Sequence, residues 1–190
     1  MVDLFEAIKK RHSVRAFRPD PVPRELIEKL IEAAALAPSA MNEQPWRFHV
    51  TTGDTRAKVG EIMACGTTHL EEFIDVMGAE HVDAAVQWYS ELGHAPVVIV
   101  CTMPKATDDF WRINKHLSIG GAIENLLLAA TALGLGACSI TFSFYVRDEL
   151  VEALSIPEDR TMIAIIALGY PEDDQPDPPE HNFDVAIYLD

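Results

Sequence analysis

Two short segments near the N-terminus carry the residues best suited to binding a planar, anionic ligand. The first is Arg11-His12-Ser13-Val14-Arg15, which places two guanidinium groups, an imidazole and a hydroxyl within five residues. An arginine side chain offers a planar fork of donors and stays charged at any working pH, so this set suits a phosphate group. The second, APSAMNEQPW at residues 37–46, places small and amide side chains between prolines, which lets a flat polar ligand approach the backbone closely.

The distribution of charge sharpens the first of these observations. The chain of 190 residues has a formal net charge of −15, which argues against nucleic acid and anionic membrane surfaces as partners. Residues 1–60 nevertheless contain 10 of the 15 Lys and Arg against 8 acidic residues, whereas residues 61–190 contain 5 against 22. The arginine motif therefore lies in a mildly basic part of an acidic chain, which fits either a solvated helix surface or a site for one small anion.

Several common chemical motifs are missing. No GxGxxG follows a strand and no GxxxxGK[ST] occurs, so neither a dinucleotide-binding fold nor a P-loop is supported. The three cysteines are far apart and form no CxxC, which favours a reducing, cytoplasmic setting over a disulfide framework: they are Cys65, Cys101 and Cys138. Cys65 and His69 have i, i+4 spacing, but no convincing set of four ligands follows, so we expect no metal site.

The hydrophobic pattern predicts helices interleaved with about four strands. Helices are expected over residues 3–11, 23–37, 54–64, 114–133 and 147–154, and strands over 47–52, 96–103, 137–142 and 161–168. Residues 65–95 read as helical in pieces. The segment 117–140 contains a single charge, Glu124, which raises a transmembrane span as an alternative, but its polar residues favour the central helix of a water-soluble domain. The class is therefore α/β or α+β, in three layers with one sheet.

The C-terminal segment 171–190 differs from the rest of the chain. It has seven acidic residues, several prolines and no Lys or Arg, so it cannot build a core of its own. Its last part, 183–189, is apolar enough to form a strand on some other surface.

Five segments, in the correct order and spread over nearly the whole chain, resemble the nitroreductase family of FMN enzymes. They are RHSVRAF at 11–17, APSAMNEQPW at 37–46, AIENLLLAA at 122–130, LGLGAC at 133–138 and LGYP at 168–171. The resemblance implies an α+β fold, a three-layer α/β/α sandwich whose central, mostly antiparallel sheet is flanked by helices. It also implies an intertwined homodimer with the helix from Asn114 as its core, a flavin-binding domain over 1–170 with 65–95 as a lid or insertion, and an extension, 171–190, that wraps the partner.

The resemblance assigns eleven residues to FMN. Arg11 and Arg15 would bind the phosphate, with His12 and Ser13 on the phosphate, the ribityl chain or the ring edge. Four further residues would reach the same flavin from the partner subunit: Pro38, Ser39, Ala40 and Asn42. Three residues would lie against the isoalloxazine ring: Ser139, Ile140 and Thr141. A backbone N–H of this strand would lie near the flavin N5.

The implied function is an oxidoreductase in which NAD(P)H delivers hydride to flavin N5 and a nitroaromatic, quinone or enone then takes the electrons, in a ping-pong sequence. Because the flavin carries the chemistry, no protein acid, base or nucleophile is expected. Two departures from the family pattern stand out. Ser139, Thr141 and Phe142 replace the Trp and Gly-Gly of similar members, and no Lys or Arg follows Arg160. The alternatives are a flavin-binding or sensor protein without turnover, a dehydrogenase or dehalogenase on the same scaffold, and a dimer that has lost flavin.

Overall fold

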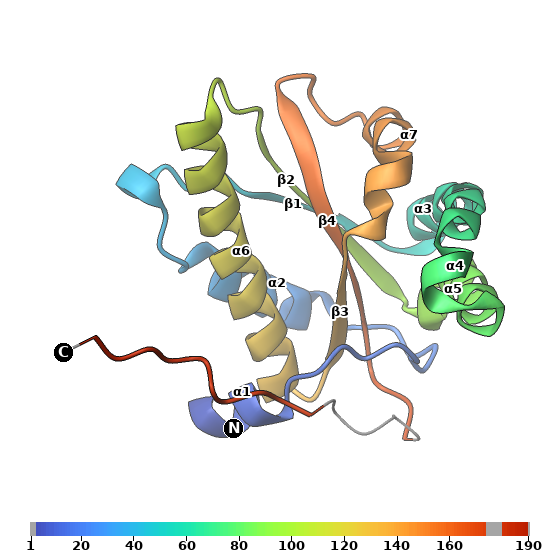
Figure 1. The fold of residues 1–190 in the computed structure, drawn as a ribbon, viewed down its shortest axis with the longest axis horizontal. Helices are drawn as coiled ribbons and strands as arrows, with labels where there is room; N and C mark the ends of the chain where they lie inside the picture. The colour runs from blue at the N-terminus through green and yellow to red at the C-terminus, as the bar shows by residue number, and fades with distance from the viewer. Residues whose placement is uncertain (1–2, 174–179, 190) are drawn as a thin grey trace.

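A four-stranded antiparallel sheet lies at the centre of the computed structural model, which describes residues 3–173 and 180–189 (Figure 1). The strand order is β1-β2-β4-β3, and the strands are β1 (Arg47–Thr51), β2 (Val97–Pro104), β3 (Gly136–Ile140) and β4 (Arg160–Gly169). The two inner strands, β2 and β4, consist almost entirely of buried residues. Their continuous apolar runs are what a strand covered on both faces requires.

The helices agree with the expected ones to within a few residues. They are α1 (Leu4–Lys10), α2 (Arg24–Ala35), α3 (Gly53–Gly66), α4 (Ile74–Met77), α5 (Ala79–Glu91), α6 (Asp109–Ala132) and α7 (Arg147–Ala153). Short 3-10 turns lie at η1 (Ala40–Asn42), η2 (Thr67–Phe73), η3 (Leu92–His94) and η4 (Phe142–Val146). The long helix α6 begins five residues before the expected start, because the Asp108 carboxylate caps it by accepting from the Trp111 N–H at 2.9 Å.

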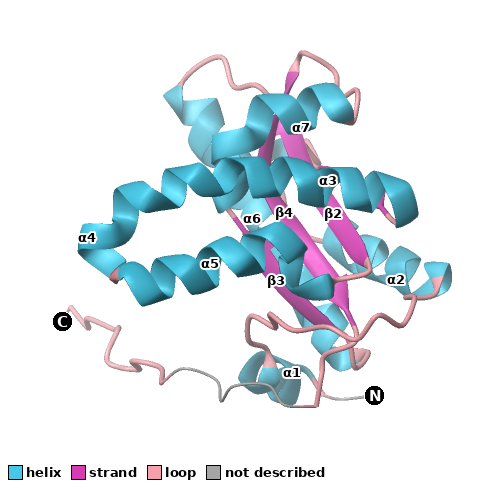
Figure 2. Cartoon of the chain, turned by 90° about the vertical axis from the view of Figure 1, so that its right-hand side faces the viewer, coloured by secondary structure: helices cyan, strands magenta, loops and turns pink. Residues whose placement is uncertain are grey.

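Helices cover both faces of the sheet, which confirms the three-layer arrangement (Figures 1 and 2). On one face, α2 and α6 pack over a core that includes Ile99 and Ile166. On the other face, α3, α5 and α7 cover a second core that includes Val98, Val100 and Ile165. Successive residues of β2 and β4 thus point into different cores, as alternating strand side chains must.

The two sheet edges differ. The chain between α1 and α2 passes along β3, where Ser13 forms a parallel bridge with Ala137. The opposite edge belongs to β1, and within the described ranges no strand pairs with its outer side. An unpaired edge strand is a template for another segment of chain.

Both α6 and α1, which contact each other, expose large apolar side chains. On α6, Phe110, Ile113 and Leu117 are 67%, 55% and 72% exposed, and they follow one another at helical spacing on one side. On α1, Leu4 and Phe5 are similarly exposed. Several exposed apolar side chains on one side of a helix, as on α6, favour an interaction site. None of the described helices is both long enough and apolar enough to cross a membrane.

Candidate functional site

The segment 11–17, called the arm below, lies tightly against the β3 edge of the sheet. The Val14 N–H donates to the Ala137 carbonyl at 3.2 Å, and the buried Val14 side chain covers Gly136. A Cβ at Gly136 would lie 2.7 Å from Val14 Cγ1, so only glycine admits the arm at this distance. Further along, the Phe17 N–H donates to the Gly93 carbonyl at 3.0 Å. The backbone that carries the arginine motif is therefore fixed at both ends.

Arg15 extends from this fixed backbone with a largely uncommitted guanidinium group. Its side chain is exposed, and its Nη1 makes one long hydrogen bond, 3.4 Å, to the carbonyl of Ser13. The Cys138 thiol of β3 lies close by: burial raises its pKa, and the Arg15 charge and the Ser13 hydroxyl oppose that shift. The structure thus brings the arginine motif and strand β3 together, two segments that the resemblance assigns to the same flavin.

Arg11 and His12 are held differently from Arg15. The Arg11 Nε forms an ion pair with Glu124 Oε1 of α6 at 3.2 Å, so part of its charge is already compensated. The His12 Nδ1 donates to the Lys10 carbonyl at 2.9 Å, because a carbonyl can only accept. The other ring nitrogen, Nε2, is buried and has no hydrogen-bond partner among the described residues. A buried ring nitrogen without a protein partner is unusual, and it leaves room for a hydrogen bond to water or to a ligand.

The end of β3 exposes two hydroxyl side chains. Ser139 and Thr141 are exposed, whereas Ile140 between them is 3% exposed and packs into the core. Within the described part of the chain, no strand pairs with the outer edge of β3 beyond the bridge at Ala137. Its last backbone groups therefore remain available to a ligand.

The helix α5, part of the segment expected to act as a lid, lies directly on the arm. Its Trp88 Nε1 donates to the Arg15 carbonyl at 2.6 Å. Its Tyr89 ring stacks on Phe142, just after β3, with ring centroids 4.4 Å apart. Burial raises the pKa of Tyr89, so its hydroxyl stays protonated at neutral pH. Aromatic side chains of the 65–95 region thus border the arm and the end of β3.

The second motif lies away from the arm, beside the first half of α6. The Ala40 N–H donates to Ser118 Oγ at 3.3 Å, and a shallow cavity of about 240 Å³ separates Pro38, Ser39 and Ala40 from Leu117. In Figure 1, η1 lies beside the upper, N-terminal half of α6, whereas α1 and the start of the arm lie at its lower end. One chain therefore holds the two expected parts of the flavin site in separate places.

The backbone of this loop is unusual. Met41, Asn42 and Gln44 have φ values of 51°, 57° and 48°, in the left-handed region that non-glycine residues seldom adopt. Hydrogen bonds within the loop support this shape, since Gln44 donates from its N–H to Ser39 Oγ at 3.0 Å and from its Nε2 to Asn42 Oδ1 at 2.9 Å.

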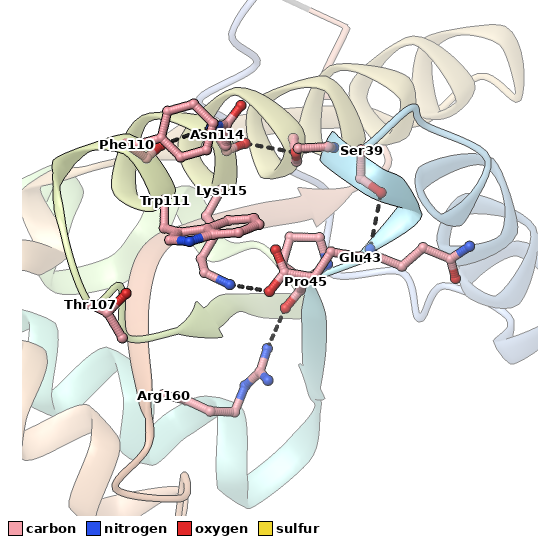
Figure 3. A network of polar contacts seen from close by, with 12 residues as sticks. Ser39, Glu43, Pro45, Thr107, Phe110, Trp111, Asn114, Lys115 and Arg160 are labelled. Carbon is pink, nitrogen blue, oxygen red and sulfur yellow. Dashed lines mark hydrogen bonds and ion pairs between the residues drawn. The ribbon is translucent and has the colours of Figure 1, made fainter.

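Two further cationic side chains bind this loop, and neither is among the flavin-site residues expected from the sequence. Lys115 of α6 pairs with Glu43, and Arg160 Nη2 of β4 donates to the Pro45 carbonyl at 2.7 Å (Figure 3). The one available signal is scarcity, because Lys115 and Arg160 are two of only five Lys and Arg beyond residue 60.

No group of three or more His, Cys, Asp and Glu in the described ranges is arranged to hold a metal ion. His69, which shares helical spacing with Cys65, pairs instead with Glu72 and stacks on Tyr145.

Comparison with known proteins places this geometry in a family. The model described as the Nitroreductase family matches residues 8–170. The chain belongs to the nitroreductase family. A putative NADH dehydrogenase/NAD(P)H nitroreductase from Archaeoglobus fulgidus is 32% identical over 183 residues, covering 92% of this chain and 89% of that protein. A 5,6-dimethylbenzimidazole synthase from Rhodospirillum rubrum is 31% identical over 176 residues, covering 88% and 82%.

A solved nitroreductase structure shows the same fold. The FMN-dependent nitroreductase NfnB from Mycobacterium smegmatis, in complex with NADPH, matches with a TM-score of 0.74 at 26% identity, covering 90% of both chains. The family and the sandwich fold expected from the sequence are confirmed. The names of these relatives include FMN and NAD(P)H, which are the cofactor and the reductant that the resemblance implies. The eleven site residues, the lid and the wrapping tail remain predictions.

Proposed function

We propose that this nitroreductase-family chain is an FMN-dependent oxidoreductase that oxidises NAD(P)H and reduces a small nitroaromatic, quinone or enone. Family membership and relatives named for NAD(P)H and FMN support the reaction class. The observation that carries the proposal is the arm, which is basic in a chain of net charge −15 and is fixed against the open end of β3.

The residues present fit FMN. A phosphate needs hydrogen-bond donors that are not already engaged. The exposed Arg15 guanidinium makes one long hydrogen bond within its own chain, so its other N–H groups are available. The buried His12 Nε2 lacks a partner among the described residues, and because Nδ1 carries the ring proton, Nε2 would accept, which suits a hydroxyl of the ribityl chain. Arg11 contributes less, because Glu124 shares its charge.

When bound, FMN supplies the hydride acceptor and donor that the protein itself lacks. The chain's own part is to bind and orient. Arg15 would hold the phosphate, His12 would bind the ribityl chain, and the open edge of β3 would offer backbone groups to the ring, with Tyr89 and Trp88 close to the end of β3 and to the arm. NAD(P)H and the electron acceptor would occupy this same space in turn.

The complete site requires a second copy of the chain. Pro38, Ser39, Ala40 and Asn42 lie beside the first half of α6, apart from the arm of their own chain. Leu117 lines the cavity beside this loop, and Phe110, Ile113 and Leu117 on the same half of α6 have exposed apolar side chains that a partner would cover. We therefore place this loop against the partner's flavin in a homodimer built on α6.

We place the C-terminal segment in a groove at the β1 edge of the partner subunit. Four alternate residues of 183–189 are apolar and 77–92% exposed: Phe183, Val185, Ile187 and Leu189. A groove of about 710 Å³ runs between α2 and the unpaired edge of β1, lined in part by Ile27, Ile31 and Val50. A strand-like segment adds naturally to such an edge. This supports the wrapping role proposed for the tail.

One experiment tests the reaction. Purified protein, or protein reconstituted with FMN, should carry flavin absorbance through gel filtration and should oxidise NADH or NADPH when a nitroaromatic or quinone is added. If no flavin stays with the protein, the cofactor assignment is wrong. If flavin stays but no acceptor supports turnover, the chain is a flavin-binding protein without this activity.

The relative that is 31% identical and named 5,6-dimethylbenzimidazole synthase favours a second candidate reaction. Chromatography of the product mixture after incubation with FMN and a reductant in the presence of molecular oxygen distinguishes the two, because only the second reaction, an oxidative cleavage of the flavin, yields dimethylbenzimidazole.

A further inference from the structure

We propose that Lys115 is a positioning residue: through the ion pair between its buried ammonium group and the more exposed Glu43, it fixes the loop 39–44 in the shape that receives the flavin of the partner subunit. The inference rests on the proposed function, in which this loop serves FMN. Lys115 itself touches neither the arm nor β3, so it would act at a distance, through the loop.

The first observation is the burial of a full positive charge. Lys115 lies on α6 and is 7% exposed, with its Nζ bonded to Glu43 Oε1 and 5.6 Å from the centroid of the Trp111 ring (Figure 3). A lysine is almost never buried without a partner, because taking its charge out of water is costly. The contact with Glu43 is therefore a strong constraint on the loop and not an incidental surface pair.

The second observation is where Glu43 lies in the loop. It stands between Asn42 and Gln44, whose φ values of 57° and 48° are both left-handed. Such residues keep this conformation only where the surrounding structure over-determines it. The ion pair therefore constrains the loop between these two residues, where the backbone conformation is least favourable.

The third observation is that the remaining tethers come from the same neighbourhood. Ser118 lies one helical turn after Lys115 on α6 and accepts from the Ala40 N–H at 3.3 Å, while Arg160 holds the Pro45 carbonyl at 2.7 Å. The loop is thus held near its start, in its middle and at its end. Of these three tethers, the one to Lys115 is the ion pair in which both side chains carry full charge.

A different role for Lys115 is direct binding of the FMN phosphate as a cation. Burial and the existing bond to Glu43 argue against it. The two roles differ in a measurable way. A residue that shapes the loop affects FMN and riboflavin alike, whereas a phosphate ligand affects FMN alone.

The test uses the full-length protein with Lys115→Met, which keeps the length of the side chain and removes its charge. Flavin fluorescence titration of the ligand-free protein should show binding of FMN and of riboflavin weakened by similar factors, about tenfold or more. The matched control is Lys58→Met on α3, where the lysine is exposed, and its affinities should not change. A loss confined to FMN would assign Lys115 to the phosphate and overturn the proposal.

A double variant separates positioning from folding stability. Glu43→Met leaves the buried Lys115 charge without its partner and should lower the thermal unfolding temperature, whereas Lys115→Met with Glu43→Met removes both charges and should restore it. Flavin affinity should remain low in the double variant, because the tether is still absent. Recovery of stability and affinity together would show a merely structural role.

Hydrogen exchange of the ligand-free protein provides a readout independent of flavin. Residues 39–44 should exchange faster in Lys115→Met than in the parent chain, while the β2 and β4 amides should not. If the parent protein binds no flavin, the proposed function fails, yet this measurement still decides whether Lys115 orders the loop. Unchanged exchange at these residues would refute the inference.

Discussion

At the scale of single residues, the two arginines of the motif are not equivalent. In the sequence they are interchangeable phosphate ligands. In the structure Arg11 pairs with Glu124 at 3.2 Å, whereas Arg15 is exposed and makes one 3.4 Å bond to its own chain. No local pattern could reveal this, because Glu124 belongs to a helix more than a hundred residues away in sequence.

We expect Arg15→Ala to weaken FMN binding about 10- to 100-fold, because a hydrogen bond to a charged group contributes roughly 1.5–3 kcal/mol. Arg11→Ala should cost less. Riboflavin, which lacks the phosphate, should bind both variants almost as it binds the parent protein. Fluorescence titration with the two ligands checks this, and equal losses for FMN and riboflavin would give Arg15 some other role.

At the scale of elements, the sequence predicts what continuous apolar runs determine. The strands β2 and β4 and the helix α6 are long and apolar, so a run of consecutive residues is enough to predict that they are buried. Residues 65–95 are less predictable, because the chain turns there through 3-10 segments and through Leu92 at a φ of 52°. The Lys115–Glu43 pair joins residues 72 positions apart, and periodicity carries no trace of it.

The contact between the arm and β3 gives a prediction at this scale. Gly136→Ala would place a Cβ within 3 Å of three atoms of Val14, so the arm must move outward. Overpacking of this kind costs about 1–3 kcal/mol of stability. Flavin binding should weaken as well, since Arg15 moves with the arm.

Gly60→Ala on α3 is the control for this change, because its Cβ would lie no closer than 3.3 Å to any neighbouring atom, the nearest being Arg56 Nη1. Thermal unfolding and flavin titration of the two variants make the comparison. If Gly136→Ala binds flavin as tightly as Gly60→Ala does, the arm is not the element that positions the phosphate site.

At the scale of the whole molecule, the exposed face of α6 and the separated half-sites point to one cause. The loop proposed to serve the flavin lies away from the arm of its own chain and beside exposed apolar side chains, which is the arrangement expected of one half of the proposed homodimer. The resemblance to a family predicts this dimer, but composition alone does not. The apolar stretch 117–140 reads equally well as the core of a single domain.

Leu117→Asp should therefore turn the dimer into a monomer and abolish tight flavin binding, since a charge would be buried in the contact between two copies. Val76→Asp is the matched control, because Val76 on α4 is 83% exposed and Leu117 is 72% exposed. Sedimentation at micromolar concentration and flavin titration measure both effects. A Leu117→Asp protein that remains a flavin-loaded dimer would place the interface elsewhere.

The sharing of each site between two chains can be tested by complementation. Asn42→Gly removes the amide that would reach across while keeping the left-handed backbone, since glycine adopts a φ of 57° without strain. Chains with Asn42→Gly and chains with Arg15→Ala, carrying different affinity tags, are unfolded together, refolded, and purified as heterodimers. If the two residues serve one flavin from different subunits, each heterodimer holds one site with both defects and one site with neither. Titration should then show tight binding at half of the sites, where each parent homodimer shows none. If no heterodimer recovers a tight site, Asn42 and Arg15 of a single chain serve the same flavin, and the loop does not cross to the partner.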